Sequence, residues 1–182
     1  MPEKPHWLER RSGRIAFIPV MIALTTVANL VMVPMPQPLA EYDLSPVLIY
    51  ALGVLLDPLT AGLIVTVAQG IGTTIKALNF GWPLVFIPGA MGVRGIEAAL
   101  ISWICRLRKE ATGEYGISRL EVMAMIVGVV WETLGFTVAD VILFGPGMAA
   151  ITLLTVVDAV FIPVAITVVV VLRRVLRVHR IG

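Results

Sequence analysis

The sequence has few charged residues: only 14% of its 182 residues are Asp, Glu, Lys or Arg, while 58% are hydrophobic. Soluble domains usually carry about 25% charged residues, so this composition excludes an ordinary water-soluble fold. The surplus apolar surface has to face lipid, and apolar runs of about 20 residues are typical of transmembrane helices. These runs lack a strict alternation of apolar and polar residues, which excludes a transmembrane β-barrel.

Several chemical signatures are also missing. Cys105 is the one cysteine, so the chain has neither a disulfide framework nor a cysteine-based metal cluster. The two histidines, His6 and His179, lie near the chain ends, outside every apolar run. The sequence contains no HExxH zinc motif, no GxSxG nucleophile motif and no Walker A loop. We therefore expect no enzymatic activity, no cofactor and no bound metal, and any transport would draw its energy from an ion gradient or a partner protein.

The apolar residues fall into six segments separated by charge clusters, prolines and glycines. They predict an all-α integral membrane bundle of six transmembrane helices that forms a single membrane domain over residues 1–182. The first segment is longer than the hydrophobic core of a secretory signal peptide, so we expect it to remain in the mature protein. The predicted helices are 14–33, 45–56, 58–78, 82–104, 120–144 and 147–172.

Local signals support several of these boundaries. Ser45-Pro46 and Asp57-Pro58 each predict a helix N-terminus, because a side-chain acceptor is followed by a proline that needs no N–H partner there. Gly145-Pro146-Gly147 predicts a tight turn between the fifth and sixth helices.

The second predicted helix is unusually short. Its rise is about 18 Å, well below a hydrocarbon core of about 30 Å. The preceding connection, residues 34–44, is rich in proline. Two interpretations are open: a short helix beneath a folded loop, which implies a cavity open to one face, or a tilted helix that begins a turn earlier, near Tyr42.

The basic residues predict the orientation in the membrane. Of the 14 Lys and Arg residues, 12 lie before the first helix, between the fourth and fifth helices, or after the sixth helix. With six spans these places share one side, and the positive-inside rule makes that side the cytoplasm. The opposite connections, 34–44, 79–82 and 145–147, contain no Lys or Arg. We therefore expect a multi-pass protein of the cell membrane with both termini in the cytoplasm.

Ionisable side chains inside predicted spans are costly to bury and therefore indicate candidate functional sites. Arg94, Glu132 and Asp158 lie at similar depths in the fourth, fifth and sixth helices. Three further residues lie closer to the predicted outer surface. Asp140 is on the same face of the fifth helix as Glu132, and Asn79 and Trp82 flank the outer turn after the third helix. We predict that these side chains form one substrate pocket open to the outside. They are Asn79, Trp82, Arg94, Glu132, Asp140 and Asp158.

A structural alternative also exists for the charged residues. Arg94 can neutralise Glu132, Asp158 or, one turn along its own helix, Glu97. Three acids that face one arginine leave an excess of negative charge, which favours a polar cavity over a purely structural network. Whether Arg94 and Glu97 form only a structural pair stays open at this point.

Small residues recur at helical spacing and predict close helix approach. We assign them to packing and to no other role. They are Gly62, Thr66, Gly70 and Thr74 in the third helix, and Gly128, Gly135 and Ala139 in the fifth.

Several stretches resemble a known family. Residues 42–48 (YDLSPVL) and 53–62 (GVLLDPLTAG) are similar to the DLS-x-PV…G-x-x-GP-x-x-G region of the substrate-binding S components of energy-coupling factor (ECF) vitamin transporters. Residues 88–95 (PGAMGVRG), with their mid-helix arginine, resemble the fourth helix of those proteins. Residues 132–136 (ETLGF) resemble their fifth helix.

The resemblance implies a membrane-embedded substrate-capture subunit that takes up a vitamin or related micronutrient from outside. It places the pocket in the outer half, beneath the loop after the first helix. It also implies a separate transmembrane coupling subunit and two cytoplasmic ATPases as partners, and no role for nucleic acid. Members of the family commonly contact the coupling subunit through an alanine pair four residues apart in the first helix. Here Ala16 is paired with Val20 and Ala23 with Pro19, so Ala16 and Ala23 are the candidate partner contacts.

An alternative from another class is a structural membrane protein of the MreD type, which has a similar size and topology but no small-molecule ligand. A tightly bound small molecule distinguishes the two, because an S component retains one and a scaffold does not. The sequence does not identify the substrate.

Overall fold

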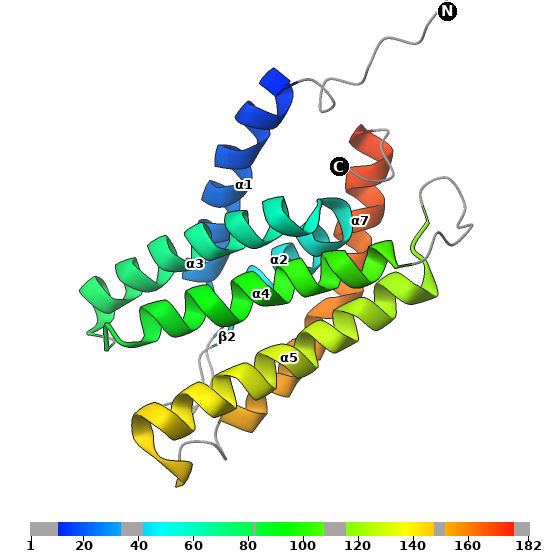
Figure 1. Cartoon of the computed structure of the whole chain (residues 1–182). Helices are drawn as coiled ribbons and strands as arrows, with labels where there is room; N and C mark the ends of the chain where they lie inside the picture. Colours follow the sequence, from blue (N-terminus) through cyan, green and yellow to red (C-terminus); the bar gives the residue numbers. More distant parts are fainter. Residues whose placement is uncertain (1–10, 34–41, 82, 108–115, 148–151, 177–182) are drawn as a thin grey trace, which may run out of the picture.

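The computed structural model describes residues 11–33, 42–81, 83–107, 116–147 and 152–176. These residues form a helical bundle with one short antiparallel ribbon (Figure 1), which confirms the all-α prediction for this part of the chain. In chain order the elements are α1 (Arg11–Leu30), β1 (Met32–Val33), β2 (Tyr42–Asp43), α2 (Ser45–Leu55), α3 (Pro58–Phe80), α4 (Phe86–Arg106), α5 (Arg119–Phe144), the 3₁₀ helix η2 (Leu153–Phe161) and α7 (Ile162–Leu176).

The helices differ in whether their length and apolar composition suit them to cross a membrane. Within the described ranges three segments are long and apolar enough: α3, α5 and the continuous segment Leu153–Leu176 formed by η2 and α7. The apolar part of α1, Ile15–Leu30, and the whole of α2 are shorter. Large apolar side chains are exposed on the outer faces of α1, α3, α5 and η2–α7, as expected for a bundle that packs against lipid.

The short helix α2 lies at the centre of the bundle. It contacts α1, α3, α4, α5, η2 and α7, and every one of its residues except Leu48 is buried. Because protein surrounds it, α2 has no need to reach across the hydrocarbon core by itself. Tyr42 belongs to β2, and the helix begins at Ser45. The interpretation of a tilted helix that begins near Tyr42 is therefore wrong. The helix is short, as the other interpretation expected, while the folded loop and the cavity stay predictions because residues 34–41 lie outside the described ranges.

One of the two predicted caps is confirmed. The Asp57 carboxylate accepts a hydrogen bond from the Thr60 N–H at 3.0 Å at the start of α3. The other prediction is wrong, because Ser45 is the first residue of α2 rather than its cap. The Ser45 N–H donates to the Asp43 carboxylate at 2.8 Å, so the capping oxygen comes from the strand before the helix.

Several helices begin or end away from their predicted limits. α4 begins at Phe86 instead of residue 82, and the last predicted helix, 147–172, corresponds to η2 and α7, Leu153–Leu176. α1 ends at Leu30 instead of Val33 because Met32 and Val33 pair with β2. The sixth predicted helix is 3₁₀ up to Phe161. Pro163 has no N–H to donate to the Ala159 carbonyl, which accepts the Ile162 N–H instead.

The predicted small-residue packing is confirmed between α3, α4 and α5. A Cβ atom at Gly62 would lie 3.2 Å from the Gly95 carbonyl oxygen, and one at Gly128 would lie 2.6 Å from Ile101. A larger residue would press on the α4 backbone at Gly62 and on the Ile101 side chain at Gly128, so small residues let the helices approach closely here.

The bundle has two distinct ends (Figure 1). We call the start of α1, the end of α4, the start of α5 and the end of α7 the basic end. The end of α1, the β1–β2 ribbon, the end of α3, the start of α4, the end of α5 and the start of η2 lie at the opposite end, which we call the loop end. A buried ion pair at 2.7 Å between Arg173 Nη2 and Glu121 Oε1 holds α7 against α5 at the basic end.

Candidate functional site

Arg94 of α4 is the centre of a buried polar network. Its Nε donates to Glu132 Oε1 of α5 at 2.9 Å, and its Nη1 donates to both carboxylate oxygens of Asp43 in β2, at 3.1 and 3.2 Å. Nη1 also donates to the Ser45 hydroxyl at the start of α2. Nη2 lies 4.0 Å from Asp158 Oδ2 of η2. One guanidinium group therefore joins β2, α2, α4, α5 and η2 at the loop end.

Asp43 contacts a second cation. Lys76 Nζ of α3 lies 3.2 Å from Asp43 Oδ2, and the Asn29 side-chain amide donates to the same oxygen at 3.3 Å. Burial alone would raise the pKa of Asp43, but the charges of Arg94 and Lys76 and the hydrogen bonds from Ser45 hold that pKa below its usual value. Asp43, which lies in β2 outside the helices, is therefore ionised and fixes the ribbon to α3 and α4.

Two amide side chains extend the network toward α1 and α3. Gln69 donates to the Ser45 hydroxyl at 2.9 Å and accepts from the Asn29 amide at 2.6 Å. A Cβ atom at Gly72 would lie 2.3 Å from Asn29 Oδ1, so glycine is needed there to leave room for the amide. We refer to the whole network as the Arg94 cluster. Its members are Asn29, Asp43, Ser45, Gln69, Lys76, Arg94, Glu132 and Asp158.

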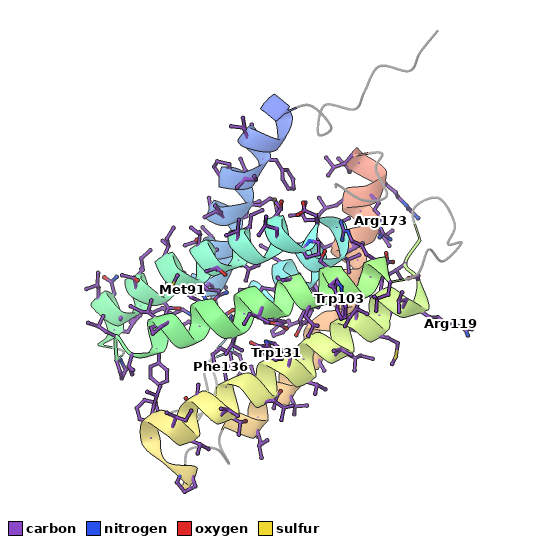
Figure 2. The ribbon with its side chains drawn as sticks, viewed as in Figure 1. Met91, Trp103, Arg119, Trp131, Phe136 and Arg173 are labelled. Carbon is purple, nitrogen blue, oxygen red and sulfur yellow. The ribbon has the colours of Figure 1, made fainter. Side chains whose placement is uncertain are left out.

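Aromatic side chains of α5 line the same region. The Arg94 Cζ atom lies 5.8 Å from the centroid of the Phe136 ring, a cation–π distance. The Trp131 indole N–H donates to the Val93 carbonyl at 2.9 Å. Figure 2 shows both aromatic side chains between α4 and α5.

A protein-family model described as "ECF-type riboflavin transporter, S component" matches residues 11–176, nearly the whole chain. The chain belongs to this family. It is therefore a membrane protein that captures a vitamin for uptake, and it is not an enzyme. Its partners are those of an ECF transporter, and the MreD-like alternative has no support. No curated protein and no solved structure matches the chain.

Three of the predicted site residues come together in this S component: Arg94, Glu132 and Asp158. They come from three different helices, as expected from their similar depths. Their side chains are buried, with exposed fractions of 9% or less.

Asp140 and Asn79 lie outside the cluster. Asp140 lies about 12 Å beyond Glu132 along α5, and its carboxylate accepts from the Thr152 hydroxyl at 2.5 Å. Asn79 is exposed and donates to the Ile75 carbonyl of its own helix at 2.8 Å. Trp82 lies outside the described residues.

Sequence reasoning missed Asp43, Ser45 and Lys76 as members of the site. A usable signal was present, because Lys76 and Arg94 are the two basic residues outside the three Lys/Arg clusters. Both contact Asp43. Two cations isolated in apolar surroundings need a carboxylate partner. Asp43, two residues before the second helix, is such a carboxylate.

Within the described ranges Glu97 makes no hydrogen bond with Arg94, so the direct pair one turn along α4 is not formed. Both of its carboxylate oxygens are buried and have no hydrogen-bond partner in the described ranges. The structural pairing with Glu132 is present, and Asp43 supplies the other strong contact.

The candidate partner contacts lie on the surface. Ala16 and Ala23 are exposed on α1, beside the exposed side chains of Val20, Leu24 and Val27. This face of α1 is apolar, and no other described element covers these side chains.

A surface groove of about 720 Å³ runs between α3 and α4, away from the cluster. Its lining is apolar apart from one threonine, and its small residues are those that bring the two helices together. We assign it to lipid-facing helix packing. The lining residues are Pro58, Leu59, Gly62, Leu63, Thr66, Pro88, Met91, Gly92, Gly95, Ile96 and Ala99.

The geometry predicts unequal roles for the two cations. Arg94→Gln leaves the carboxylates of Asp43, Glu132 and Asp158 without their shared partner, and removing one side of a buried ion pair costs about 3–5 kcal/mol. Lys76→Gln should cost less, because Asp43 keeps its contacts with Arg94. Thermal unfolding of the purified variants in detergent measures the difference, and equal losses would contradict the central position of Arg94.

Proposed function

We propose that the Arg94 cluster is the vitamin-binding site of this S component. The observation that carries the proposal is the buried guanidinium of Arg94, which contacts side chains from β2, α2, α5 and η2. Ionisable groups within a membrane bundle are costly and usually serve substrate binding or transport. The cluster lies at the loop end, where a vitamin from outside would arrive if the basic end faces the cytoplasm.

The surroundings of the cluster suit a small organic ligand. Such sites are mostly apolar, with a few placed polar groups that fix orientation. Phe136 and Trp131 offer aromatic surface beside the charged groups, and the Tyr42 hydroxyl ties β2 to η2 by donating to the Leu154 carbonyl at 2.6 Å. The family description names riboflavin, so riboflavin is the substrate that we propose and the first ligand to test.

The role of Glu132 gives the first test. Glu132→Gln removes a charged hydrogen-bond partner at nearly constant shape, which should weaken riboflavin binding by about 10- to 150-fold. Isothermal titration of the purified protein measures the affinity, and the yield of folded protein should stay close to wild type. Thr167→Val, at an exposed position on α7, is the control, with unchanged affinity. If Glu132→Gln abolishes folding, the carboxylate is only a structural partner of Arg94 and the site proposal fails.

We also propose that the chain crosses the membrane six times with both termini in the cytoplasm. The described members of the three Lys/Arg clusters, among them Arg106, Arg119 and Arg173, lie at the basic end, which supports a cytoplasmic orientation of that end. A reporter fused after Gly182 or inserted near Gly113 should give a cytoplasmic signal. An external signal at either point would contradict the six-span topology.

Transport by this S component, in our proposal, requires a membrane coupling subunit and two cytoplasmic ATPases. The exposed apolar face of α1 around Ala16 and Ala23 is the proposed contact, because small residues let helices approach closely. Ala23→Leu should weaken co-purification with the coupling subunit and leave riboflavin affinity unchanged. Ala159→Leu, at an exposed position on η2, is the matched control. Undiminished assembly of Ala23→Leu would place the contact elsewhere.

A further inference from the structure

Two acidic side chains of the Arg94 cluster contact each other. The carboxyl groups of Glu132 on α5 and Asp158 on η2 are joined by a side-chain hydrogen bond. Both residues are buried, with exposed fractions of 0% and 3%. An ionised carboxylate only accepts hydrogen bonds, so two carboxyl groups that bond to each other must hold one proton between them.

The distances from Arg94 indicate which of the two carries the proton. Glu132 Oε1 accepts a hydrogen bond from Arg94 Nε at 2.9 Å, whereas Asp158 Oδ2 lies 4.0 Å from Arg94 Nη2. A positive charge stabilises an ionised carboxylate, and this effect weakens with distance. Glu132 is therefore the ionised member of the pair, and Asp158 is the member that has kept its proton.

The charges in direct contact within the cluster balance when that proton is in place. The two cations are Arg94 and Lys76, and Asp43 contacts both. Asp43 and Glu132 together supply two negative charges, equal to the two positive ones. An ionised Asp158 would add a third negative charge beside Glu132, and burying a charge without a close partner costs several kcal/mol.

The other titratable groups near the pair do not supply a further cation. Arg94 already donates to Glu132 and Asp43, and Arg173 of α7 pairs with Glu121 at the basic end. Among the described residues Asp158 therefore has no cation within hydrogen-bond distance. The groups around the pair are Tyr42 and Asp43 in β2, Tyr50 in α2, Lys76 in α3, and Arg94 and Glu97 in α4.

We propose that Asp158 is a proton-binding residue of the folded protein and that its carboxyl O–H donates to the Glu132 carboxylate. This hydrogen bond joins η2 to α5 at the loop end without adding a charge to the bundle. The proton belongs to the protein itself and is held whether or not a vitamin is bound, so this role goes beyond the proposed function.

Infrared spectroscopy of the purified protein, with any bound vitamin removed, gives the direct test. A protonated carboxyl group has a C=O stretching band that an ionised carboxylate lacks. The difference spectrum between wild type and Asp158→Asn should contain this band, and the band should shift in D₂O. Asp57→Asn at the start of α3 is the matched control without such a band, because Asn also caps a helix. No band in the Asp158→Asn difference spectrum would overturn the proposal.

Two amide variants distinguish the carboxyl group that holds the proton from the one that is ionised. Asp158→Asn keeps an N–H donor toward Glu132, so its riboflavin affinity should stay close to wild type. Glu132→Gln removes the ionised partner of Arg94 and should weaken riboflavin binding by about 10- to 150-fold. Equal affinities of the two variants, or the reverse order, would overturn the assignment to Asp158. If the wild-type protein does not bind riboflavin, the proposed function fails, while the infrared spectra still decide the proposal.

The pH dependence of unfolding is a second measurement that needs no ligand. While the folded protein holds a proton that the unfolded chain has released, its stability falls as the pH rises. From mildly acidic pH upward, the thermal stability of the wild type should therefore fall more steeply than that of Asp158→Asn, which has no such proton. Identical pH profiles would overturn the proposal.

A different variant keeps the proposal testable if Asp158→Asn does not fold. In Glu132→Gln, Asp158 becomes the nearest carboxyl group to that side of Arg94 and loses the carboxylate that its O–H would donate to. Asp158 should then ionise, and the carboxylic acid band should disappear from the infrared spectrum. Persistence of the full wild-type band in Glu132→Gln would overturn the proposal.

Discussion

The contact between Arg94 and Asp43 is the interaction on which the loop end of this S component depends. Asp43 is held in a two-residue strand, not in a helix, and its carboxylate contacts two cations and the first N–H of α2. In a medium that excludes water, such groups are stable only when paired. The ion pair therefore fixes the start of α2, the ribbon and α4 relative to one another, and it places the other acids around a single guanidinium.

The basic end contains a buried ion pair that we assign a structural role only. Arg173 donates to both oxygens of Glu121, at 2.7 and 3.3 Å, and to the Gly116 carbonyl, while Glu121 also accepts the Ser118 N–H at 2.9 Å. Neither side chain has an unpaired buried oxygen or nitrogen in the part of the chain described. In the Arg94 cluster, by contrast, one guanidinium contacts carboxylates from three different elements.

Much of the fold could be predicted from the sequence because long apolar runs set the approximate limits of α3 and α5, and Asp57-Pro58 set the start of α3. The ribbon could not, since two paired residues have no periodicity and depend on the return of the chain after residue 41. Pro163 accounts for the last 3₁₀ hydrogen bond of η2, from the Ile162 N–H to the Ala159 carbonyl, but not for the 3₁₀ form of the earlier residues. Depth alone identified Arg94, Glu132 and Asp158, but it could not identify Asp43, which lies outside any helix. Position along the helices also placed Asp140 in the predicted pocket, although it lies about 12 Å from Glu132 along α5.

The central claim, that the Arg94 cluster holds a vitamin in this S component, is tested most directly by mass spectrometry of the small molecules released when the purified protein is denatured. The account predicts a single vitamin, in stoichiometric amount, from the wild-type protein and a strongly reduced amount from Glu132→Gln. Release of no small molecule from the wild-type protein, or of equal amounts from both proteins, would contradict it.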